Sequence, residues 1–375
     1  MKPTLLKMSH ISKSYPGVKA VNDVSIDLHA GEVLGLMGEN GAGKSTLIKL
    51  LAGAEIMDLG EVFIDEKKVD INSPKSSQEN GVSVIYQELI TMDTLSVAEN
   101  IFVGQLPVNK NTKLIDWKTA EQKSSEVLSL LNSDINPKSI VGTLSIYEKQ
   151  IVEVAKAIHK NARVLVMDEP TAALSEKDSK SLFKVIDSLK KQGVGIIYIS
   201  HRIEEVFNIT DRISVMRDGL LIGTKKTKSA DKKEIISMMI GRELNQFFPE
   251  IKSEKKGVML KVSNLNIDGI IENINFEVNK GEIVGLFGLV GSGCLNIARS
   301  LVGVDEIDQG EIYINGKQIA INTPKSAMQN KIGFIPIDRK HEGLTLDFSV
   351  KQNLSLQSLE RLGSGFMIQE SVENS

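Results

Sequence analysis

The chain has 375 residues, of which 41% are hydrophobic and 25% are charged, as is usual for soluble globular proteins. Its formal net charge of -3 gives no global field that would draw it to nucleic acid, and no apolar run is long enough for a signal peptide or a membrane span. The single cysteine, Cys294, excludes an intramolecular disulfide and fits a reducing compartment. We therefore expect a cytosolic chain of two or three domains with no nucleic-acid partner.

Apolar runs predict the secondary structure of the first two thirds of the chain in order. Residues 33–37 (VLGLM) predict a short buried strand, and residues 44–51 predict the helix that follows it. Residues 91–160 contain no comparable strand and are expected to be helical. Ser175 and Asp178 predict the start of a helix that ends at Gly193. Further buried strands are predicted over residues 82–86, 164–167 and 195–199. This alternation indicates an α/β fold with a mostly parallel sheet and a helical subdomain.

Landmarks of the first part of the chain recur 250 residues later without insertions. They are Gly31-Glu32 and Gly281-Glu282 (281 − 31 = 250), Gly38 and Gly288, Gly60-Glu61 and Gly310-Glu311, and Pro74-Lys75-Ser76 and Pro324-Lys325-Ser326. Such a fixed period indicates a repeated domain. We therefore predict a first domain over residues 4–248, a charged linker over residues 249–257, and an incomplete second copy over residues 258–375.

The second copy contains two apolar runs that predict strands, residues 281–288 and 331–337. Their apolar faces require later elements to cover them, and this copy has only about half the length of the first. We expect those faces to be exposed, and the second copy to be the less stable part of the chain.

Residues 38–46 (GENGAGKST) fit the phosphate-binding loop pattern G-x-x-x-x-G-K-[ST], between a predicted strand and a predicted helix. The glycines allow backbone N–H groups to point at phosphate oxygens, and the lysine adds a positive charge near the β- and γ-phosphates. The serine hydroxyl can hold Mg²⁺, and the helix N-terminus favours an anion. The residues predicted to bind ATP here are Gly38, Glu39, Asn40, Gly41, Ala42, Gly43, Lys44, Ser45 and Thr46.

A second motif, a pair of acidic residues, follows the apolar strand at residues 163–167. Asp168 at the strand tip suits Mg²⁺, directly or through water, and Glu169 suits polarising the attacking water. Acidic pairs in turns are common, but this one comes 124 residues after Lys44 (168 − 44 = 124), which supports a shared site.

The order of the motifs resembles that of the ABC ATPases. Residues 144–150 (LSIYEKQ) stand where the family has its signature, and residues 171–175 (TAALS) where it has its D-loop. The resemblance implies an adenine-stacking role for Tyr15, a Q-loop role for Gln87 in catalysis and Mg²⁺ binding, and a switch role for His201. Taken singly, each of these residues has an ordinary structural explanation. The implied metal ligands are Ser45, Gln87 and Asp168, and the implied catalytic residues are Glu169, His201 and Gln87.

A finer resemblance is to the double-cassette ATPases of bacterial monosaccharide importers of the ribose, galactose and xylose type. The matching stretches include KSYPGVKAVNDVS, GENGAGKSTLIKLLAG, DEPTAALSEK, YISHRIEEVF and DRKHEGL, and residues 264–276 are closest to ribose-type members. The resemblance implies ATP and Mg²⁺ as ligands and a peripheral location at the cytoplasmic face of the membrane. It implies permease subunits docked near Gln87 as partners, and a periplasmic or extracellular sugar-binding protein as an indirect one. A second cassette-bearing chain is a further candidate partner.

Several residues depart from the family pattern. Ile146 and Tyr147 replace the two signature glycines, where a glycine would let the backbone approach the γ-phosphate. In the second phosphate loop, Cys294 and Leu295 stand at the positions of Lys44 and Ser45. Ile337 stands at the position of Gln87. We therefore predict that the site formed by the first signature and the second loop is not catalytic, and that the isolated chain hydrolyses ATP very slowly. The alternatives are a soluble ABC-family ATPase of translation or repair, and an inactive truncated remnant.

Overall fold

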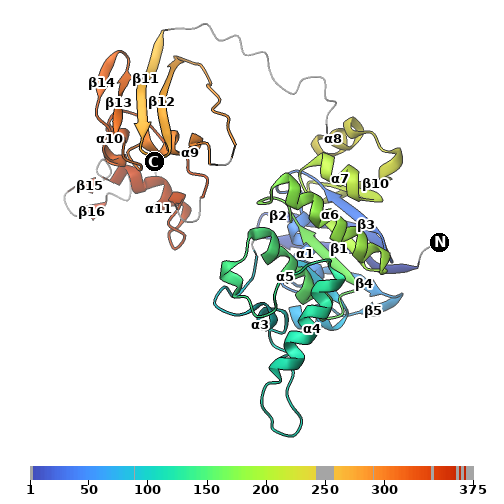
Figure 1. Cartoon of the computed structure of the whole chain (residues 1–375). Coiled ribbons are helices and arrows are strands. Elements are labelled where there is room, and N and C mark those ends of the chain that lie inside the picture. The colour runs from blue at the N-terminus through green and yellow to red at the C-terminus, as the bar shows by residue number, and fades with distance from the viewer. Residues whose placement is uncertain are drawn as a thin grey trace. The chain divides into compact units, whose positions relative to one another are not determined.

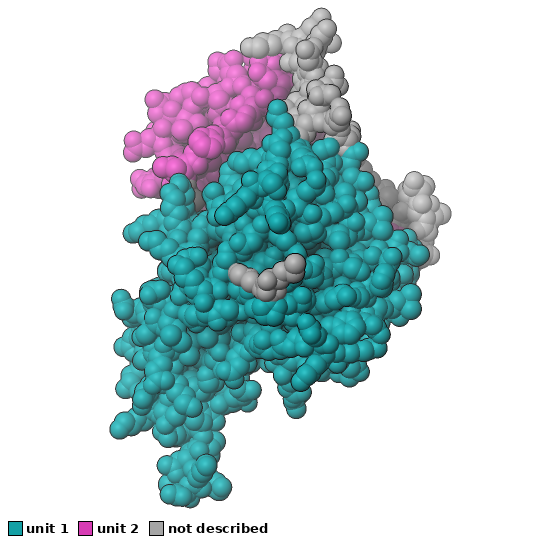
Figure 2. Space-filling view, turned by 90° about the vertical axis from the view of Figure 1, so that its right-hand side faces the viewer, with its two compact units in different colours: residues 1–247 teal, residues 248–375 magenta. Residues whose placement is uncertain are grey.

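The computed structural model describes residues 3–87, 89–241, 257–289, 291–338 and 342–359, and the backbone of 363–364 and 367–368. Contacts within the chain define two compact units, residues 1–247 and 248–375, which are coloured separately in Figure 2. Residues 249–256 of the predicted linker lie outside the described residues. No described helix is long and apolar enough to cross a membrane.

The first unit is built on a six-stranded sheet with the order β10-β9-β3-β8-β7-β6. Figure 1 labels β3 and β10 of this sheet. All neighbours run parallel except β10, which is antiparallel to β9. Every residue of β3 and β8 is buried, as expected of strands covered on both faces. All four predicted strands are therefore confirmed, but Ser83 and Val84 of β6 and Asp168 of β7 are half-buried. The bounds are Val33–Met37 (β3), Val82–Ile85 (β6), Val164–Asp168 (β7), Gly195–Ile199 (β8), Arg212–Arg217 (β9) and Leu220–Lys226 (β10).

A four-stranded antiparallel sheet accompanies the first, with the order β2-β1-β4-β5. Its strands are Thr4–Tyr15 (β1), Val18–His29 (β2), Leu59–Ile64 (β4) and Lys67–Val69 (β5). One core cluster combines Leu6 and Met8 of this sheet with Leu34 and Leu36 of β3 and with the apolar face of α1 (Lys44–Leu51). The alternate residues of β3, Val33 and Met37, belong to a second cluster with the helices on the opposite face. The helix α1 thus packs both against β3, the strand that precedes it, and against the antiparallel sheet.

Helices make up the region between β6 and β7, as predicted. They are α3 (Val97–Ile101), α4 (Trp117–Leu130) and α5 (Ile146–His159), with a 3-10 turn at Val141–Thr143. Ser175 begins α6, because its Oγ accepts a hydrogen bond from the backbone N–H of Asp178 at 3.2 Å. The other helices of this unit are α2 (Pro74–Glu79), α6 (Glu176–Lys191), α7 (Ile203–Ile209) and α8 (Lys232–Ile240), with a 3-10 turn at Thr227–Ser229.

The second unit repeats part of the first at the predicted spacing. Its sheet has the order β12-β11-β13-β14, and β13 and β14 lie 250 residues after β4 and β5. The helix α10 begins at a capping box built on Thr323 and Ser326, as α2 begins at Ser73 and Ser76. The bounds are Val258–Ile267 (β11), Ile271–Asn279 (β12), Cys294–Ser300 (α9), Gln309–Ile314 (β13), Lys317–Ile319 (β14), Pro324–Gln329 (α10), Val350–Ser355 (α11), Leu356–Ser358 (3-10), Gly363–Ser364 (β15) and Met367–Ile368 (β16).

The predicted strands over residues 281–288 and 331–337 are wrong, because no described residue of these segments lies in a strand. Their counterparts β3 and β6 are hydrogen-bonded to β7, β8 and β9 in the first unit. Among the described residues of the second unit, no strand pairs with either segment. Several apolar side chains are exposed, as expected: Ile283 by 86%, Phe287 by 98% and Ile335 by 94%. Ile332 and Phe334 instead pack against a core cluster of the second unit.

Candidate functional site

Four loops that carry predicted site residues follow parallel strands and meet at one edge of the six-stranded sheet. The phosphate loop follows β3, Gln87 follows β6, Glu169 follows β7 and His201 follows β8. Because β3, β8, β7 and β6 are consecutive neighbours, their carboxyl ends lie side by side. This edge is where ligands bind in open α/β sheets.

The phosphate loop has backbone positions that only glycine fits. Gly43 precedes α1 with a φ of 97°, and a Cβ there would lie 2.2 Å from the carbonyl oxygen of Ala20. At Gly38 a Cβ would lie 2.3 Å from the carbonyl oxygen of Met216. The Lys44 Nζ donates hydrogen bonds to the carbonyl oxygens of Gly38 at 2.8 Å and Glu39 at 2.9 Å. These two hydrogen bonds hold the Lys44 side chain across the phosphate loop.

Charges of opposite sign face each other across this edge. Burial lowers the pKa of the Lys44 ammonium, while the nearby carboxylates of Glu169 and Asp168 act to raise it. Burial and the charge of Glu169 raise the pKa of Asp168, and Lys44 opposes that shift. Two carboxylates thus share one neighbouring cation, which leaves negative charge for a further cation to neutralise.

The three predicted catalytic side chains come together. The Gln87 Nε2 donates a hydrogen bond to Glu169 Oε2 at 3.2 Å, and His201 Nδ1 lies 3.1 Å from Glu169 Oε1. Glu169 has a φ of 48°, in the left-handed region that non-glycine residues rarely adopt. Its backbone N–H donates to the carbonyl oxygen of Ile199 at 2.9 Å, which ties the end of β7 to the end of β8. Strained backbone of this kind is concentrated at functional sites.

Tyr15 lies at the end of β1, paired with Val18 in the hairpin with β2. Its ring is half-buried, and the Lys13 Nζ lies 5.7 Å from the ring centroid. Asp58 accepts hydrogen bonds from the Lys13 Nζ at 3.0 Å and the Ser14 N–H at 2.7 Å, which fixes the strand end. Ala20 of the same hairpin touches Gly43, so Tyr15 lies on the hairpin that borders the phosphate loop.

The predicted metal ligands offer oxygen atoms. The Ser45 side chain is exposed, and Asp168 is half-buried at the end of β7. Gln87 donates through Nε2 to Glu169, which leaves its Oε1 available as an acceptor. Hydroxyl, amide and carboxylate oxygens are the ligands that Mg²⁺ prefers, and bound phosphates supply the remainder.

The signature segment begins α5 with a capping box. The Glu148 Oε2 accepts from the Ser145 N–H at 2.8 Å, and the Ser145 Oγ accepts from the Glu148 N–H at 3.3 Å. Ile146 is 51% exposed, whereas Tyr147 is half-buried and packs against the core. The helix N-terminus is thus capped by a carboxylate, with an exposed apolar side chain beside it.

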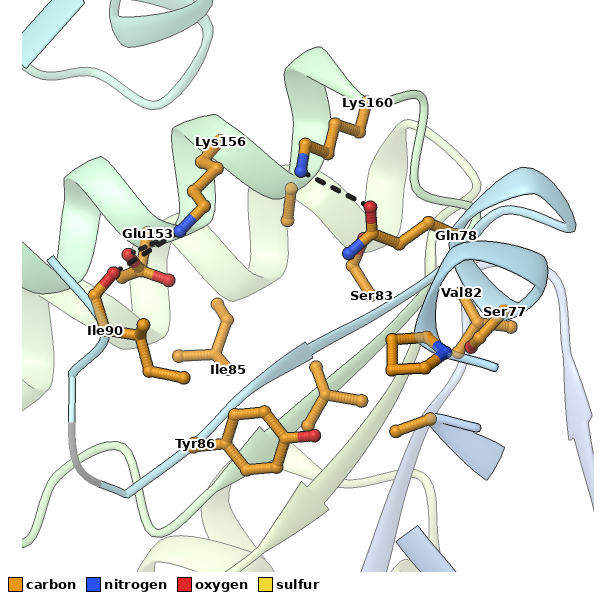
Figure 3. A pocket seen from close by; sticks show the side chains of 14 residues that line it. Ser77, Gln78, Val82, Ser83, Ile85, Tyr86, Ile90, Glu153, Lys156 and Lys160 are labelled. Atoms are coloured by element: carbon orange, nitrogen blue, oxygen red, sulfur yellow. Dashed lines mark hydrogen bonds and ion pairs between the residues drawn. The ribbon is translucent and has the colours of Figure 1, made fainter. Parts of the chain in front are cut away.

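A pocket lies between α5, α2 and β6 in the first unit (Figure 3). Its lining includes the apolar side chains of Val84, Ile85 and Ala157, while Lys156 and Lys160 come from α5. Tyr86, which directly precedes Gln87, also lines the pocket, and burial raises the pKa of its hydroxyl. The pocket therefore adjoins the loop that supplies Gln87.

Sequence reasoning missed a buried carboxylate beneath this site. Glu205, in the first turn of α7, is 9% exposed and accepts a hydrogen bond from the Thr171 Oγ1 at 2.6 Å. It also accepts from the Tyr198 hydroxyl at 2.9 Å. The only sequence signal is its place four residues after His201, in a helix whose first turn contains two glutamates.

The fold and the site define a P-loop ATPase. A phosphate loop and its helix follow one strand of a parallel sheet, and an acidic pair ends a nearby strand. The family model described as ABC transporter matches residues 21–172 and 271–374.

The chain is 44% identical over 369 residues to the ribose import ATP-binding protein RbsA of Geobacillus kaustophilus, covering 98% of this chain and 75% of that protein. It is 42% identical over 373 residues to a putative ribose/galactose/methyl galactoside import ATP-binding protein of Pseudomonas syringae pv. syringae, covering 99% and 71%. The crystal structure of the ADP conformation of an ATP-binding cassette of an ABC transporter matches with a TM-score of 0.57 and 26% identity. That match covers 64% of this chain and 99% of the other. The chain therefore belongs to the ABC transporter family and is an ABC ATPase.

Proposed function

We propose that the chain hydrolyses ATP to energise the uptake of a monosaccharide, of the ribose type, through a membrane permease at the cytoplasmic face of the membrane. The observation that carries the ATPase part is the convergence of Gln87 and His201 on Glu169 beside the phosphate loop. The identity of 41–44% to sugar-import ATP-binding proteins over nearly the whole chain supports the transport part.

Each residue of this edge has a role in the proposed reaction. Lys44 binds the β- and γ-phosphates together with the N–H groups of residues 38–46, and the Tyr15 ring stacks on adenine. Glu169 accepts the proton of the attacking water, since its side chain is only 22% exposed and lies between the Gln87 amide and the His201 imidazole. A His201 imidazole that donates from Nδ1 to Glu169 keeps Nε2 free to face the γ-phosphate. The chemistry is thus mostly positioning and electrostatics.

Ser45, Gln87 and Asp168 would hold Mg²⁺. Burial and the neighbouring charge of Glu169 raise the pKa of Asp168, and this pair of carboxylates fits a divalent cation there. When bound, the ion neutralises charge on the phosphate oxygens. The side chains of this chain then keep it in place through their oxygen atoms.

The two phosphate loops of the chain are unequal in this proposal. Lys44 and Ser45 of the first loop belong to the catalytic site with Asp168, Glu169 and His201. In the second loop, Cys294 and Leu295 supply neither a fixed positive charge nor a metal ligand. In the first signature segment, the Glu148 carboxylate at the start of α5 adds repulsion for a phosphate. Neither the second loop nor this signature segment therefore supports hydrolysis.

The permease docks in the pocket next to Gln87. Its apolar lining accepts an apolar side chain of a cytoplasmic permease helix, while Lys156 and Lys160 border it (Figure 3). The Lys156 Nζ already contacts Glu153 at 3.1 Å, and the Lys160 Nζ contacts Gln78 Oε1 at 3.3 Å. Tyr86 lines the pocket, and its neighbour Gln87 contacts Glu169. A permease helix bound in the pocket is therefore linked to the catalytic carboxylate through these two adjacent residues. A sugar-binding protein outside the membrane communicates with the chain only through the permease.

Sugar uptake into proteoliposomes tests the proposal. The vesicles contain the permease and the wild-type chain or its Glu169→Gln variant, with ATP on the chain's side and the sugar-binding protein on the other. We expect ATP-dependent uptake of labelled ribose with the wild type and none with the variant. ATP turnover that ignores the permease, together with no uptake of ribose, galactose or xylose, would instead indicate a soluble ABC ATPase.

A further inference from the structure

Glu205 lies at the centre of a buried hydrogen-bond network. This network joins the loops that carry Glu169 and His201, the two residues of the reacting pair. Its Oε2 accepts hydrogen bonds from the Thr171 Oγ1 at 2.6 Å, the Tyr198 hydroxyl at 2.9 Å and the Ser200 Oγ at 3.3 Å. Its Oε1 lies 3.1 Å from the Arg202 Nη1. One carboxylate thus receives all four donors.

The donors come from segments that flank the reacting side chains. Thr171 is two residues after Glu169, at the start of residues 171–175, and Ser200 and Arg202 are the two neighbours of His201. The Ser200 Oγ also accepts from the Arg202 N–H at 3.0 Å, so the loop around His201 is fixed on both sides. The network therefore sets the distance between the turn that carries Glu169 and the loop that carries His201.

The Glu205 carboxylate and three of its four donors are buried, and the fourth donor, Arg202, has a side chain that is 44% exposed. Tyr198, Thr171 and Ser200 are 0%, 2% and 3% exposed, whereas the His201 side chain is 63% exposed. Burial also raises the pKa of Tyr198 far above its ordinary value, so its hydroxyl remains a donor. A buried carboxylate with four donors has strong, directional bonds, because the alternative is an unpaired buried charge.

We propose that Glu205 is a positioning residue for ATP hydrolysis, which holds Glu169 and His201 at their contact distance through Thr171, Ser200 and Arg202. This inference rests on the proposed catalytic roles of Glu169 and His201. Small displacements of a reacting group lower the rate strongly while leaving ligand binding intact. A residue of this kind therefore affects kcat and not the affinity for ATP.

Glu205→Gln tests the proposal. It keeps the shape of the side chain and removes its charge. The new NH₂ group then faces either the three hydroxyl donors or the Arg202 guanidinium. The matched control is Glu32→Gln at the other end of β3, where a buried glutamate lies 3.0 Å from the Arg212 Nε. Both changes remove one buried charge from an ion pair with arginine. Only Glu205 lies beneath the reacting pair.

Three measurements separate positioning from general stability. ATP affinity is measured by calorimetry on the 375-residue chain, and kcat and KM are measured with the permease. The chain has five histidines, and the ¹⁵N imidazole resonance of His201 is identified as the one that disappears in a His201→Gln variant. For Glu205→Gln we expect at least a tenfold lower kcat, ATP affinity and KM within threefold of wild type, and a shifted His201 resonance. For Glu32→Gln we expect a lower unfolding temperature, and an unchanged kcat and His201 resonance.

A pair of smaller changes keeps the test decisive if Glu205→Gln does not fold. Thr171→Val removes one donor to Glu205, and Thr171→Ser keeps the hydroxyl. We expect Thr171→Val to lower kcat and shift the His201 resonance, and Thr171→Ser to restore both. Wild-type kcat and His201 resonance in Glu205→Gln and Thr171→Val would overturn the proposal, as would equal losses in Glu205→Gln and Glu32→Gln. The imidazole spectrum needs no turnover, so it tests positioning even if the importer assignment fails.

Discussion

Replacing Lys44 with alanine should weaken ATP binding, and the hydrogen bonds of Lys44 set a minimum for the increase in Kd. An ammonium group has three N–H donors, and the Lys44 Nζ already uses two for the carbonyl oxygens of Gly38 and Glu39. One N–H remains for a phosphate oxygen, and a hydrogen bond of this charge-assisted kind contributes about 1.5–3 kcal/mol. That corresponds to a roughly 10- to 150-fold higher Kd. The estimate is a lower bound, because Asp168 and Glu169 would then face the phosphates without their neighbouring cation.

Isothermal titration calorimetry with ATP and Mg²⁺ on the purified chain measures this loss. The matched control is Lys49→Ala, which removes an exposed lysine from the same helix and should leave the Kd unchanged. The thermal unfolding midpoint of both variants shows whether the cassette is still folded. A Kd of Lys44→Ala within threefold of wild type would refute this reasoning, because the phosphates would then bind elsewhere.

The remaining predictions concern catalysis and stability. Glu169→Gln should keep ATP affinity and lower turnover by about 10²–10⁴-fold, because an amide cannot accept the proton; normal turnover with the permease would contradict the role of Glu169. His201→Ala should likewise bind ATP and cleave it slowly in the same assay. Asp168→Asn should raise the unfolding temperature of the nucleotide-free chain at pH 7. The raised pKa of Asp168 means that its ionised form destabilises the fold above that pKa but not below the ordinary carboxyl pKa, so the gain should vanish in acid; equal midpoints at pH 7 would refute it. Arg212→Ala should destabilise the first unit by about 3–5 kcal/mol in urea unfolding, because it leaves the Glu32 carboxylate buried without its charged partner; a change below 1 kcal/mol would contradict this.

Much of the first unit could be predicted from the sequence, because its local signals agree with its tertiary structure. Uninterrupted apolar runs at residues 33–37 and 195–199 become the fully buried strands β3 and β8. Ser175 begins α6 as its spacing to Asp178 predicts. The phosphate loop is recognisable because its chemistry depends on backbone geometry, and a Cβ at Gly38 or Gly43 would meet backbone atoms.

Two features could not be predicted in this way, for different physical reasons. The segments at residues 281–288 and 331–337 have strand-like sequences, but a parallel strand also needs neighbours to accept its hydrogen bonds. Glu205 escaped notice because a glutamate near the start of a helix is usually an exposed, dipole-compatible residue. Its burial depends on donors from Thr171 and Tyr198, which only the folded sheet brings together.

The capping of α5 shows how the structure refines a sequence-based expectation. Tyr147 replaces a signature glycine, and its half-buried side chain packs against the core. The exposed side chain is Ile146, and the Glu148 carboxylate accepts a hydrogen bond from the Ser145 N–H. Charge and an apolar side chain, more than the bulk of Tyr147, therefore support the proposal that this signature does not serve a catalytic site.

ATP turnover by the chain, measured alone and after reconstitution with its permease and the sugar-loaded binding protein, tests the central proposal most directly. We expect very slow turnover by the isolated chain, marked stimulation by the permease, and loss of the stimulated rate in Glu169→Gln. Turnover that is equally fast without the permease, or that persists in Glu169→Gln, would contradict the assignment of this chain as the motor of a sugar importer.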